Sequence, residues 1–600
     1  MILRGRSAGL RSRVTLRATV SRRILLPLAF FLATFSLAIY VTGGFVASPL
    51  GLRVSARSPM PSAIAALAAM AAWMIVAARA GAIRDDLLHA EVWLSAHASV
   101  RIATIAGLAG AIAIRYGSYS AAGSDASGYL SQAVMLGSGE LMRAEPLTAV
   151  ANWPDAAATL APLGWRAAME PGLQVPTYAV GLPLLMTPLH AVGGLSAAAL
   201  VAAASLAVAV WATGRVALQV AGPPAAAIAA VWLATSPVAL IQSMQPMSDM
   251  PVTAAWLVCW LLVLPNATVS PLPRSAAAGI AAGLAILIRP NLAPLAAIPA
   301  LWLMRRSTCS VAAFSVPVAL AGVTVGYLQW RYFGSPWRSG YGTAGEIYAM
   351  SNVAPNAALY TRWLLETQGL VLLLAPLAAV WPSSPGRRTM RWLLGFAALV
   401  ILPYLFYAVF EVWTYLRFLL PAIAIAMVAV AALASAWIAR VPRPWRPPIL
   451  ATILLALAAM NIAAARSHGV FRFAAGQSRA ALAGRYLDSL IPEKSVLIAG
   501  EQSGAMRYHT GRSIVRWDVL SPEALERVNA QLSASDYDIW IALDAWEEEL
   551  FRVRFPGTAA AALDWPPRLE AGGALLTRAW RLRDREPFMR GERITTDRLR

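Results

Sequence analysis

The sequence is poor in charged residues, lysine and cysteine. Charged residues make up 13% of its 600 residues, whereas a soluble domain carries roughly 25%. We therefore expect most of the chain to meet lipid or other helices instead of water. The two cysteines, Cys259 and Cys309, fall in or beside apolar segments. They are too few for a disulfide framework or a thiolate metal site.

Lys494 is the only lysine, so arginine carries nearly all of the positive charge behind the formal net charge of +20. Most of the arginines lie in short loops between apolar segments, which is the distribution that the positive-inside rule describes. A nucleic-acid-binding protein would need a basic face on a soluble domain. We therefore expect no nucleic-acid partner.

Long apolar runs recur from Ile24 to Ala464, and a membrane span needs ~20 such residues. The sequence thus predicts an all-α polytopic membrane protein with about 13 transmembrane helices. The predicted segments are 24–46, 60–80, 99–115, 177–193, 195–213, 223–242, 250–265, 275–288, 292–304, 310–330, 364–382, 390–410, 415–438 and 447–464. We interpret 177–193 as a partial insertion, because Pro183 and Pro188 break it.

The arginine clusters also predict the orientation. A basic cytoplasmic N-terminus (1–23) precedes a transmembrane domain (24–465), whose first span we take to be uncleaved. Arginines at 305–306, 387–391 and 440–446 mark loops on the inside. This leaves loops 116–176 and 331–363 outside, and it requires a hairpin of two short arms with Arg289 at its outer turn.

The composition becomes ordinary after about residue 465, and 466–600 is predicted to be a small extracytoplasmic α/β soluble domain. Segments 495–499 and 539–543 have the pattern of buried strands, and 522–532 and 546–553 that of helices. Such alternation favours a parallel sheet.

Asp125 opens the outer loop 116–176, immediately before an amphipathic helical pattern. An aspartate at this place is typical of a helix N-cap, and the helix is expected to lie flat on the membrane surface. A purely structural role for Asp125, as a cap, is one interpretation.

The wider pattern offers another interpretation, because the chain resembles bacterial members of the GT-C superfamily related to protein O-mannosyltransferases and lipid A aminoarabinose transferases. The residues that carry the resemblance are SDASGY (124–129), YAVGLPLL (178–185), MSDMP (247–251), GLAILIRP (283–290) and YLRFLLP (415–421). The resemblance implies an inverting glycosyltransferase that takes a hexose or pentose from a polyprenyl-phosphate donor at the outer membrane face.

By that resemblance, Asp125 is the catalytic base, and Asp249 is the second catalytic acid, which orients the donor or the acceptor. The family often has another acid one or two places after the first, where this chain has Ala126 and Ser127, so we assign no metal ligand and leave a divalent cation open. The alternative for Asp249 is a cap of the helix beginning at Pro251.

Substrate binding is assigned to five side chains. Arg289 and Arg417 suit the phosphate, because a guanidinium offers a planar fork and keeps its proton. The alternative for both is an interfacial anchor. The others are Tyr129 in the outer loop and, in the Gly- and Tyr-rich loop 331–363, Tyr341 and Glu346.

The expected partners are membrane lipid, a polyprenyl-phosphate sugar donor and a lipid, glycan or protein acceptor, in the bacterial plasma membrane. The rival function is a transporter or flippase for a lipid-linked sugar. Many transporters consist of two related halves, and we find no internal repeat.

The topology is testable by cysteine labelling. Single cysteines at positions 150, 345 and 520 of a variant without Cys259 and Cys309 should react with an impermeant thiol reagent in intact cells. Protection of position 345 or 520 would contradict the hairpin at Arg289.

Overall fold

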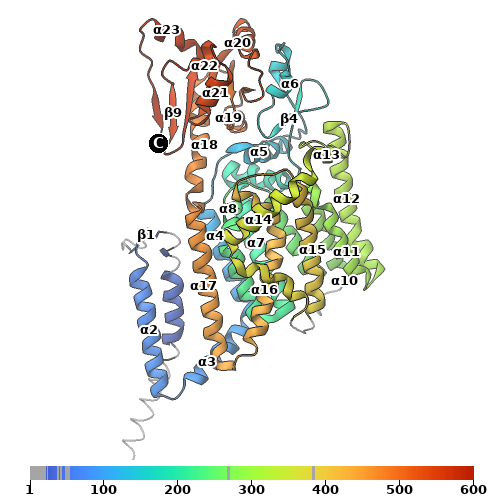
Figure 1. Cartoon of the computed structure of the whole chain (residues 1–600), viewed down its shortest axis with the longest axis vertical. Helices are drawn as coiled ribbons and strands as arrows, with labels where there is room; N and C mark the ends of the chain where they lie inside the picture. Colours follow the sequence, from blue (N-terminus) through green and yellow to red (C-terminus); the bar gives the residue numbers. More distant parts are fainter. Residues whose placement is uncertain are drawn as a thin grey trace, which may run out of the picture.

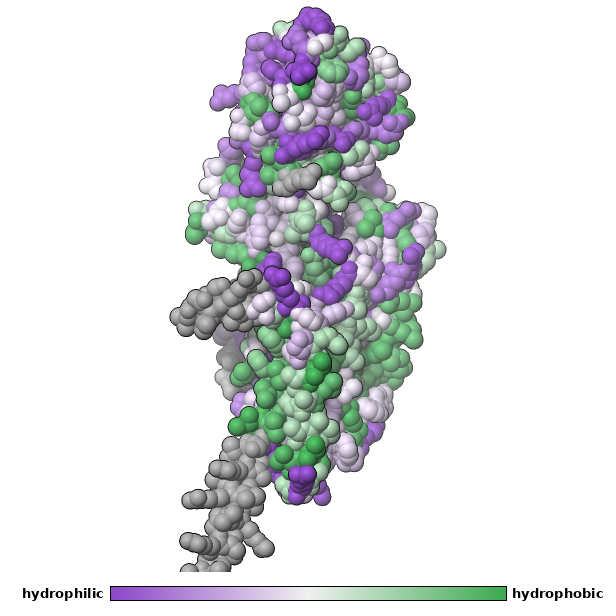
Figure 2. Space-filling model, turned by 90° about the vertical axis from the view of Figure 1, so that its left-hand side faces the viewer, coloured by the Kyte–Doolittle hydropathy of each residue, from purple (hydrophilic) through white to green (hydrophobic). Residues whose placement is uncertain are grey.

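The computed structural model describes residues 22, 24–36, 39–40, 43–47, 54–265, 271–381 and 386–599. A helical bundle carries a sheet-containing domain at one end (Figure 1), formed by the C-terminal part of the chain. Figure 2 shows hydrophobic residues over the bundle and hydrophilic residues concentrated on the sheet domain. We call the end of the bundle next to this domain the sheet end.

Eight helices in the described part of the chain are long and apolar enough to cross a membrane, which makes the chain a multi-pass membrane protein. They are α2 (Met60–Arg79), α4 (Ala98–Arg115), α7 (Gly181–Thr235), α10 (Pro271–Ile288), α12 (Thr308–Phe333), α15 (Arg387–Phe406), Trp413–Ile438 with α16, and Arg443–Ser467 with α17. Shorter apolar helices are Ile24–Ser36, Asp249–Val263 (α9), Pro290–Met304 and Leu370–Ala379. The figure of about 13 crossings stays a prediction.

Helix α7 consists of three pieces, because Gly193, Gly194 and Gly222 have non-helical backbone angles. The pieces correspond to the predicted segments 177–193, 195–213 and 223–242. Gly181, at the start of the first piece, packs against the backbone of Ile288, and His190 Nε2 lies 3.3 Å from the Tyr508 hydroxyl of the sheet domain. Both ends of this piece therefore lie at the sheet end, as expected for a partial insertion.

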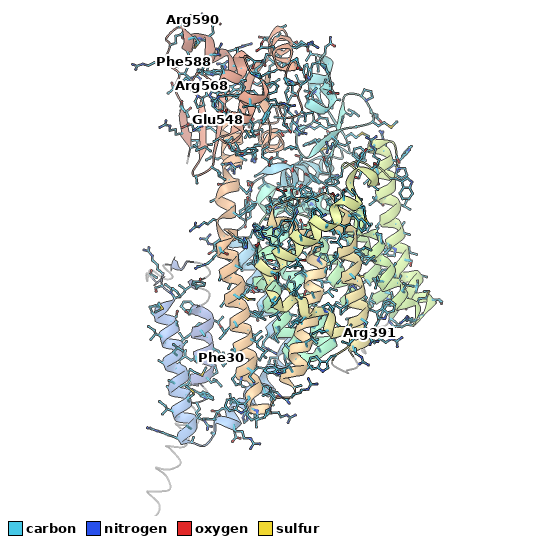
Figure 3. All side chains as sticks on the ribbon, viewed as in Figure 1. Phe30, Arg391, Glu548, Arg568, Phe588 and Arg590 are labelled. Carbon is cyan, nitrogen blue, oxygen red and sulfur yellow. The ribbon has the colours of Figure 1, made fainter. Side chains whose placement is uncertain are left out.

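The predicted hairpin around Arg289 is present. Helix α10 ends at Ile288, a 3-10 turn covers Pro290–Ala296 (η3), and α11 (Ala297–Met304) follows. Helix α10 packs closely on α12, since Gly279 and Gly283 lie against the α12 backbone, as small residues allow in membrane helix pairs. Arg391, in a predicted inner loop, lies at the end of the bundle away from the sheet (Figure 3).

The sheet domain has six strands in the order β11-β9-β10-β8-β6-β7. The strands are β6 (Ser495–Ala499), β7 (Ser513–Arg516), β8 (Asp538–Asp544), β9 (Leu569–Gly572), β10 (Leu576–Arg581) and β11 (Asp597–Leu599). The predicted strands 495–499 and 539–543 are β6 and β8, and the predicted helices are α20 (Ala524–Ala534) and α21 (Glu547–Arg554). The sheet is mixed and not purely parallel, because β8 pairs with β10 and β10 with β9 in antiparallel fashion.

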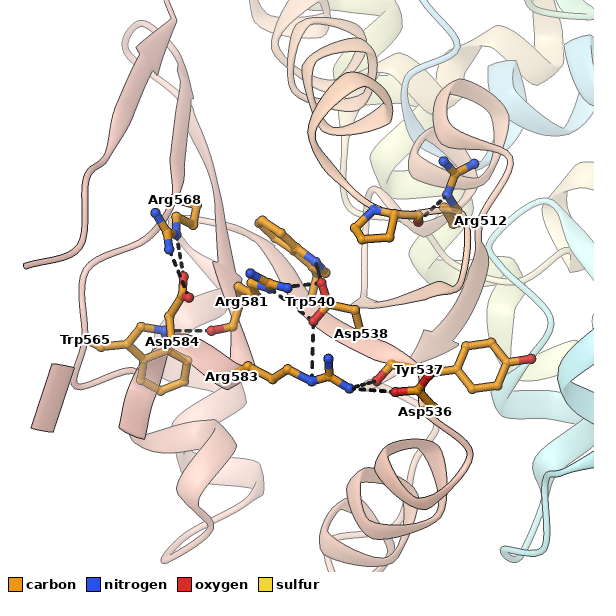
Figure 4. Close-up of polar contacts among 11 residues, drawn as sticks. Arg512, Asp536, Tyr537, Asp538, Trp540, Trp565, Arg568, Arg581, Arg583 and Asp584 are labelled. Atoms are coloured by element: carbon orange, nitrogen blue, oxygen red, sulfur yellow. Dashed lines mark hydrogen bonds and ion pairs between the residues drawn. The ribbon is translucent and has the colours of Figure 1, made fainter. Parts of the chain in front are cut away.

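A network of ion pairs joins the strands of this sheet (Figure 4). Asp538, which begins β8, accepts hydrogen bonds from Arg581 and from the Trp540 indole, both at 2.9 Å. Asp584 forms an ion pair with Arg568. These contacts tie the C-terminal strands to the centre of the sheet.

The loop 116–176 is folded against the sheet domain. It contains α5 (Gly123–Gly137), η2 (Pro146–Ala149), α6 (Ala156–Thr159) and a small sheet of β3 (Arg143–Ala144), β4 (Trp165–Ala167) and β5 (Leu173–Pro176). Leu147, Trp153 and Leu160 of this loop belong to the hydrophobic core of the sheet domain. The loop and the domain therefore share one core.

A buried ion pair reinforces this junction. Glu145 is fully buried, and its carboxylate lies 3.1 Å from Arg507 and accepts a 2.5 Å hydrogen bond from Ser513. Both partners come from the sheet domain.

Helix α5 has no polar face free in water, because Ser127, Ser131 and Gln132 are buried and the helix packs against α7 and α19 (Ser503–Thr510). One choice made above is corrected by this packing. Position 520, chosen above for labelling, holds the fully buried Leu520, so the exposed Glu523 is the appropriate position for that cysteine.

The shared core predicts that two ion pairs of the loop contribute unequally to the free energy of unfolding. Glu145→Ala leaves a buried guanidinium unpaired and should lower the free energy of unfolding by about 3–5 kcal/mol. Glu170→Ala is the matched control, because Glu170 pairs with Arg331 at the surface and such a pair contributes about 0.2–1 kcal/mol. Thermal unfolding in detergent measures both, and equal losses would contradict the assignment.

Candidate active site

Four charged side chains meet at the sheet end of the bundle, between helices that are far apart in the sequence. Asp125 lies in the first turn of α5, Asp249 begins α9, Arg289 follows α10, and Arg417 lies in the 3-10 turn Trp413–Leu419 (η6). They form a row of alternating charge: Arg417 Nη2 lies 3.0 Å from Asp125, Arg417 Nε 4.0 Å from Asp249, and Arg289 Nη2 2.5 Å from Asp249. The structure thus brings together the two acids and the two arginines singled out in the sequence.

Asp249 and Arg289 form the deeper pair. The Asp249 side chain is fully buried, and that of Arg289 is 13% exposed. Arg289 also donates to the Ser248 hydroxyl at 3.2 Å and to the Tyr404 hydroxyl at 3.3 Å. Asp249 Oδ2 is buried and has no hydrogen-bond partner among the described residues.

The alternative role of Asp249, as a helix cap, is not found in the structure. Helix α9 begins at Asp249 itself, its N-cap residue is Ser248, and no side chain makes a cap hydrogen bond there. The carboxylate faces Arg289 instead, because burying an ionised group without a counter-charge is far more costly than leaving a helix end uncapped.

Asp125 and Arg417 form the pair nearer to solvent, with side chains that are 25% and 15% exposed. The alternative role of Asp125, as an N-cap, is not found either: the cap residue is Ala122, and Asp125 lies within the first turn. The Gly123 N–H donates instead to Gln502 of the sheet domain, at 3.3 Å. The Arg417 guanidinium lies over the rings of Tyr415 and Phe418, so it is held within the site and does not reach into water.

Three tyrosines lie together beside this row of charges. The Tyr129 and Tyr178 ring centroids are 4.6 Å apart, and those of Tyr178 and Tyr341 are 6.0 Å apart. Burial and the charge of Asp125 raise the pKa of Tyr178 well above its usual range, so its hydroxyl remains neutral. Tyr178 was not assigned to the site from the sequence, although it opens one of the motifs of the resemblance.

The structure does not bring Glu346 to this site. Its carboxylate accepts the Thr343 N–H at 2.9 Å and completes the capping box of α13 (Ala344–Ile347). Glu346 therefore stabilises the local turn, and its nearness to Tyr341 in the sequence does not place it in the site.

A cavity of about 300 Å³ opens beside Asp125 and Arg417. Five of its lining residues come from the C-terminal part of the chain: Gln477, Arg479, Glu501, Gln502 and Trp546. Sequence reasoning missed this half of the site, because Glu501 and Trp546 belong to no motif and meet Asp125 only through the docking of the domain.

Two carboxyl groups at this wall have raised pKa values. Burial, followed by the charges of Asp544 and Asp518, raises the pKa of Glu501. Burial also raises the pKa of Glu547 to about 7, although its carboxylate accepts two backbone N–H groups.

The divalent cation left open by the sequence finds no ligand set in the described part of the chain. No three His, Cys, Asp or Glu side chains lie together there as metal ligands. Arg417 lies between Asp125 and Asp249, so a guanidinium already occupies the position where a cation would bridge the two carboxylates.

Comparisons with known proteins give structural matches only. No family model and no curated protein matches the chain. ArnT from Cupriavidus metallidurans bound to undecaprenyl phosphate is similar, with 11% identity over 79% of this chain and 97% of that one, at a TM-score of 0.49. The archaeal oligosaccharyltransferase AglB from Archaeoglobus fulgidus, in complex with an inhibitory peptide and a dolichol-phosphate, has 11% identity over 77% of this chain and 72% of that one, at a TM-score of 0.44.

Both proteins have the GT-C fold.

The depth of the two ion pairs predicts different costs of disrupting them. Asp249→Ala removes the only fully buried carboxylate of the row and should lower the free energy of unfolding by about 3–5 kcal/mol. Asp125→Ala should cost less, since water reaches this pair. Thermal unfolding in detergent compares the two variants. An equal loss of unfolding free energy would contradict the assignment of a deeper and a shallower ion pair.

Proposed function

We propose that the chain is a membrane glycosyltransferase that transfers a sugar from a polyprenyl-phosphate donor to an acceptor hydroxyl. The reaction would take place at the sheet end of the bundle, on the outer face of the bacterial plasma membrane. The observation that supports this best is the row Asp125–Arg417–Asp249–Arg289. It combines two buried guanidiniums with one carboxylate that faces a polar cavity.

The arginines are suited to the phosphate of the donor. A polyprenyl phosphate holds its phosphate at the end of a chain that stays in the lipid, and Arg289 and Arg417 lie where the helices end. Guanidinium groups bind phosphate oxygens through two parallel N–H donors, and they remain charged when buried. They would also stabilise the charge that the phosphate gains as it leaves, which is the main electrostatic contribution expected of such a site.

Asp125 is suited to the acceptor. In the proposed step, the acceptor oxygen forms a bond to the anomeric carbon while the bond between that carbon and the phosphate oxygen breaks. The electron pair leaves with the polyprenyl phosphate, and the acceptor proton moves to Asp125. Attack opposite the leaving phosphate inverts the anomeric configuration.

Arg417 lies beside Asp125 and is also assigned to the donor phosphate, so it links binding of the donor to the proposed base. While Arg417 pairs with Asp125, the guanidinium occupies one oxygen of the carboxylate. A phosphate that draws Arg417 away would free that oxygen for the acceptor hydroxyl. Binding of the donor would therefore make the base available to the acceptor.

The rival function, transport or flipping of a lipid-linked sugar, gains no support from the site. It gives no role to a carboxylate placed at a polar cavity beside two phosphate-binding groups.

Asp125→Asn tests the role of Asp125 as a base. The change is nearly isosteric and keeps a hydrogen bond to Arg417 possible, so the protein should unfold at nearly the parental temperature. Sugar transfer should fall by ~100-fold or more, the usual range for loss of a general base.

The practical assay is complementation of the glycan that a deletion strain lacks, supported by transfer from a polyprenyl-phosphate sugar pool in nanodiscs. Asp155→Asn, in the same loop but away from the row, is the matched control and should remain fully active. Full complementation by Asp125→Asn would exclude Asp125 as the base.

A further inference from the structure

The sheet domain presents the carboxyl ends of its parallel strands to Asp125. Strand β6 pairs in parallel with β7 on one side and with β8 on the other. The chain runs from β6 through α19 to β7 and then returns past β6 to β8, so the strand order reverses at β6. Open α/β sheets bind ligands in the crevice outside the strand ends at such a reversal.

Three residues at this reversal line the cavity. Glu501 and Gln502 follow the end of β6, and Trp546 follows the end of β8. All three line the cavity together with Asp125 and Arg417. The crevice therefore opens directly onto the proposed base.

A buried polar network fixes this wall in place. Asp544, at the end of β8, accepts hydrogen bonds from Arg479 at 2.7 Å, from Thr577 at 2.6 Å and from Gln502 at 3.2 Å. Glu547 accepts the N–H groups of Glu501 and Asp544, both at 2.9 Å. The wall is thus held in one geometry before any ligand arrives, which lowers the ordering cost of binding.

Gln502 connects the wall to the proposed base. Its amide N–H₂ donates to Asp544, and its oxygen accepts the Gly123 N–H at the start of α5. Asp125 lies two residues further along, so the position of the wall and that of Asp125 are coupled.

The chemistry of the lining indicates the kind of ligand. Two partly exposed carboxamides, Gln245 and Gln477, line the cavity, and a carboxamide both donates and accepts hydrogen bonds, as sugar hydroxyls do. Trp546 is 53% exposed and offers an indole face of the kind that stacks on the C–H face of a sugar ring. Met247 is the only large aliphatic side chain of the lining, which is too little apolar surface for an acyl chain.

A peptide fits less well. Peptides that bind sheets usually add to a strand edge, whereas this cavity lies at the strand ends.

We propose that this crevice is the acceptor subsite and that the acceptor is a saccharide, which presents one hydroxyl to Asp125. The inference rests on the proposed function, because it names the acceptor of the same reaction. As in the proposed reaction, the saccharide oxygen takes the donor sugar, its proton goes to Asp125, and polyprenyl phosphate leaves.

Saturation-transfer NMR on the full-length protein in nanodiscs tests the subsite. The probes are methyl glycosides of common hexoses and pentoses, short oligosaccharides and, separately, peptides containing Ser or Thr. At least one saccharide should bind, and Trp546→Ala should weaken that binding by about tenfold, the range expected for loss of one aromatic contact. Trp445→Ala is the matched control, because Trp445 is 60% exposed and lies in η7 (Arg443–Trp445), before α17.

Three results would overturn the proposal: no saccharide binds, the two tryptophan variants behave alike, or only the peptides bind and lose their signal in Trp546→Ala. Binding of undecaprenyl phosphate tests the proposed function separately. It should be unchanged in Trp546→Ala and weakened in Arg417→Lys, which keeps the charge but loses the fork. If Arg417→Lys binds undecaprenyl phosphate as tightly as the parental protein does, the phosphate role is contradicted. The result for saccharide binding is not affected by that outcome.

Discussion

Two guanidinium groups buried at the ends of membrane helices are the constraint on which the rest of this structure depends. An arginine at this depth is costly unless it has a counter-charge, and the chain supplies Asp249 to Arg289 and Asp125 to Arg417. Each pair joins elements that are distant in the sequence, the second across 292 positions. The need to neutralise these charges therefore helps to decide how α5, α9, α10 and η6 meet.

In the proposed function, the same constraint would make the site responsive to an anion. The row holds two positive and two negative groups, so a phosphate that enters competes with the carboxylates for the guanidiniums. Asp249 is fully buried and Asp125 is 25% exposed, so Asp125 is the carboxylate that is more easily released. In the proposed function, this layering would let Asp249 hold Arg289 in place and would leave Asp125 available for chemistry.

The sheet domain completes the site because it cannot separate from the loop that carries Asp125. Leu147, Trp153 and Leu160 of that loop lie in the domain core, and Glu145 is held by Arg507 and Ser513. A surface domain on a flexible tether would leave the strand ends at no fixed distance from Asp125. Here the shared core and the contact between Gln502 and Gly123 set that distance.

The sequence predicted the parts of this arrangement that leave a local signal. Arginine distribution and the cost of a buried charge led to the hairpin at Arg289, and apolar β-branched runs led to β6 and β8. The motifs pointed to all four charged residues of the row. Neither aspartate caps its helix, which was the alternative for both, because a tertiary partner for Asp125 and Asp249 outweighs the local preference for a helix end. Glu501, Gln502 and Trp546 were not assigned to the site, since their position depends on how two distant segments dock, which no local pattern records.

We propose that donor phosphate takes Arg417 from Asp125. A cryo-electron microscopy structure of the protein with undecaprenyl phosphate tests this exchange most directly. We expect a phosphate within hydrogen-bond distance of both Arg289 and Arg417, with the contact between Arg417 and Asp125 broken and Asp125 facing the cavity. A phosphate bound elsewhere, with that contact intact, would contradict it.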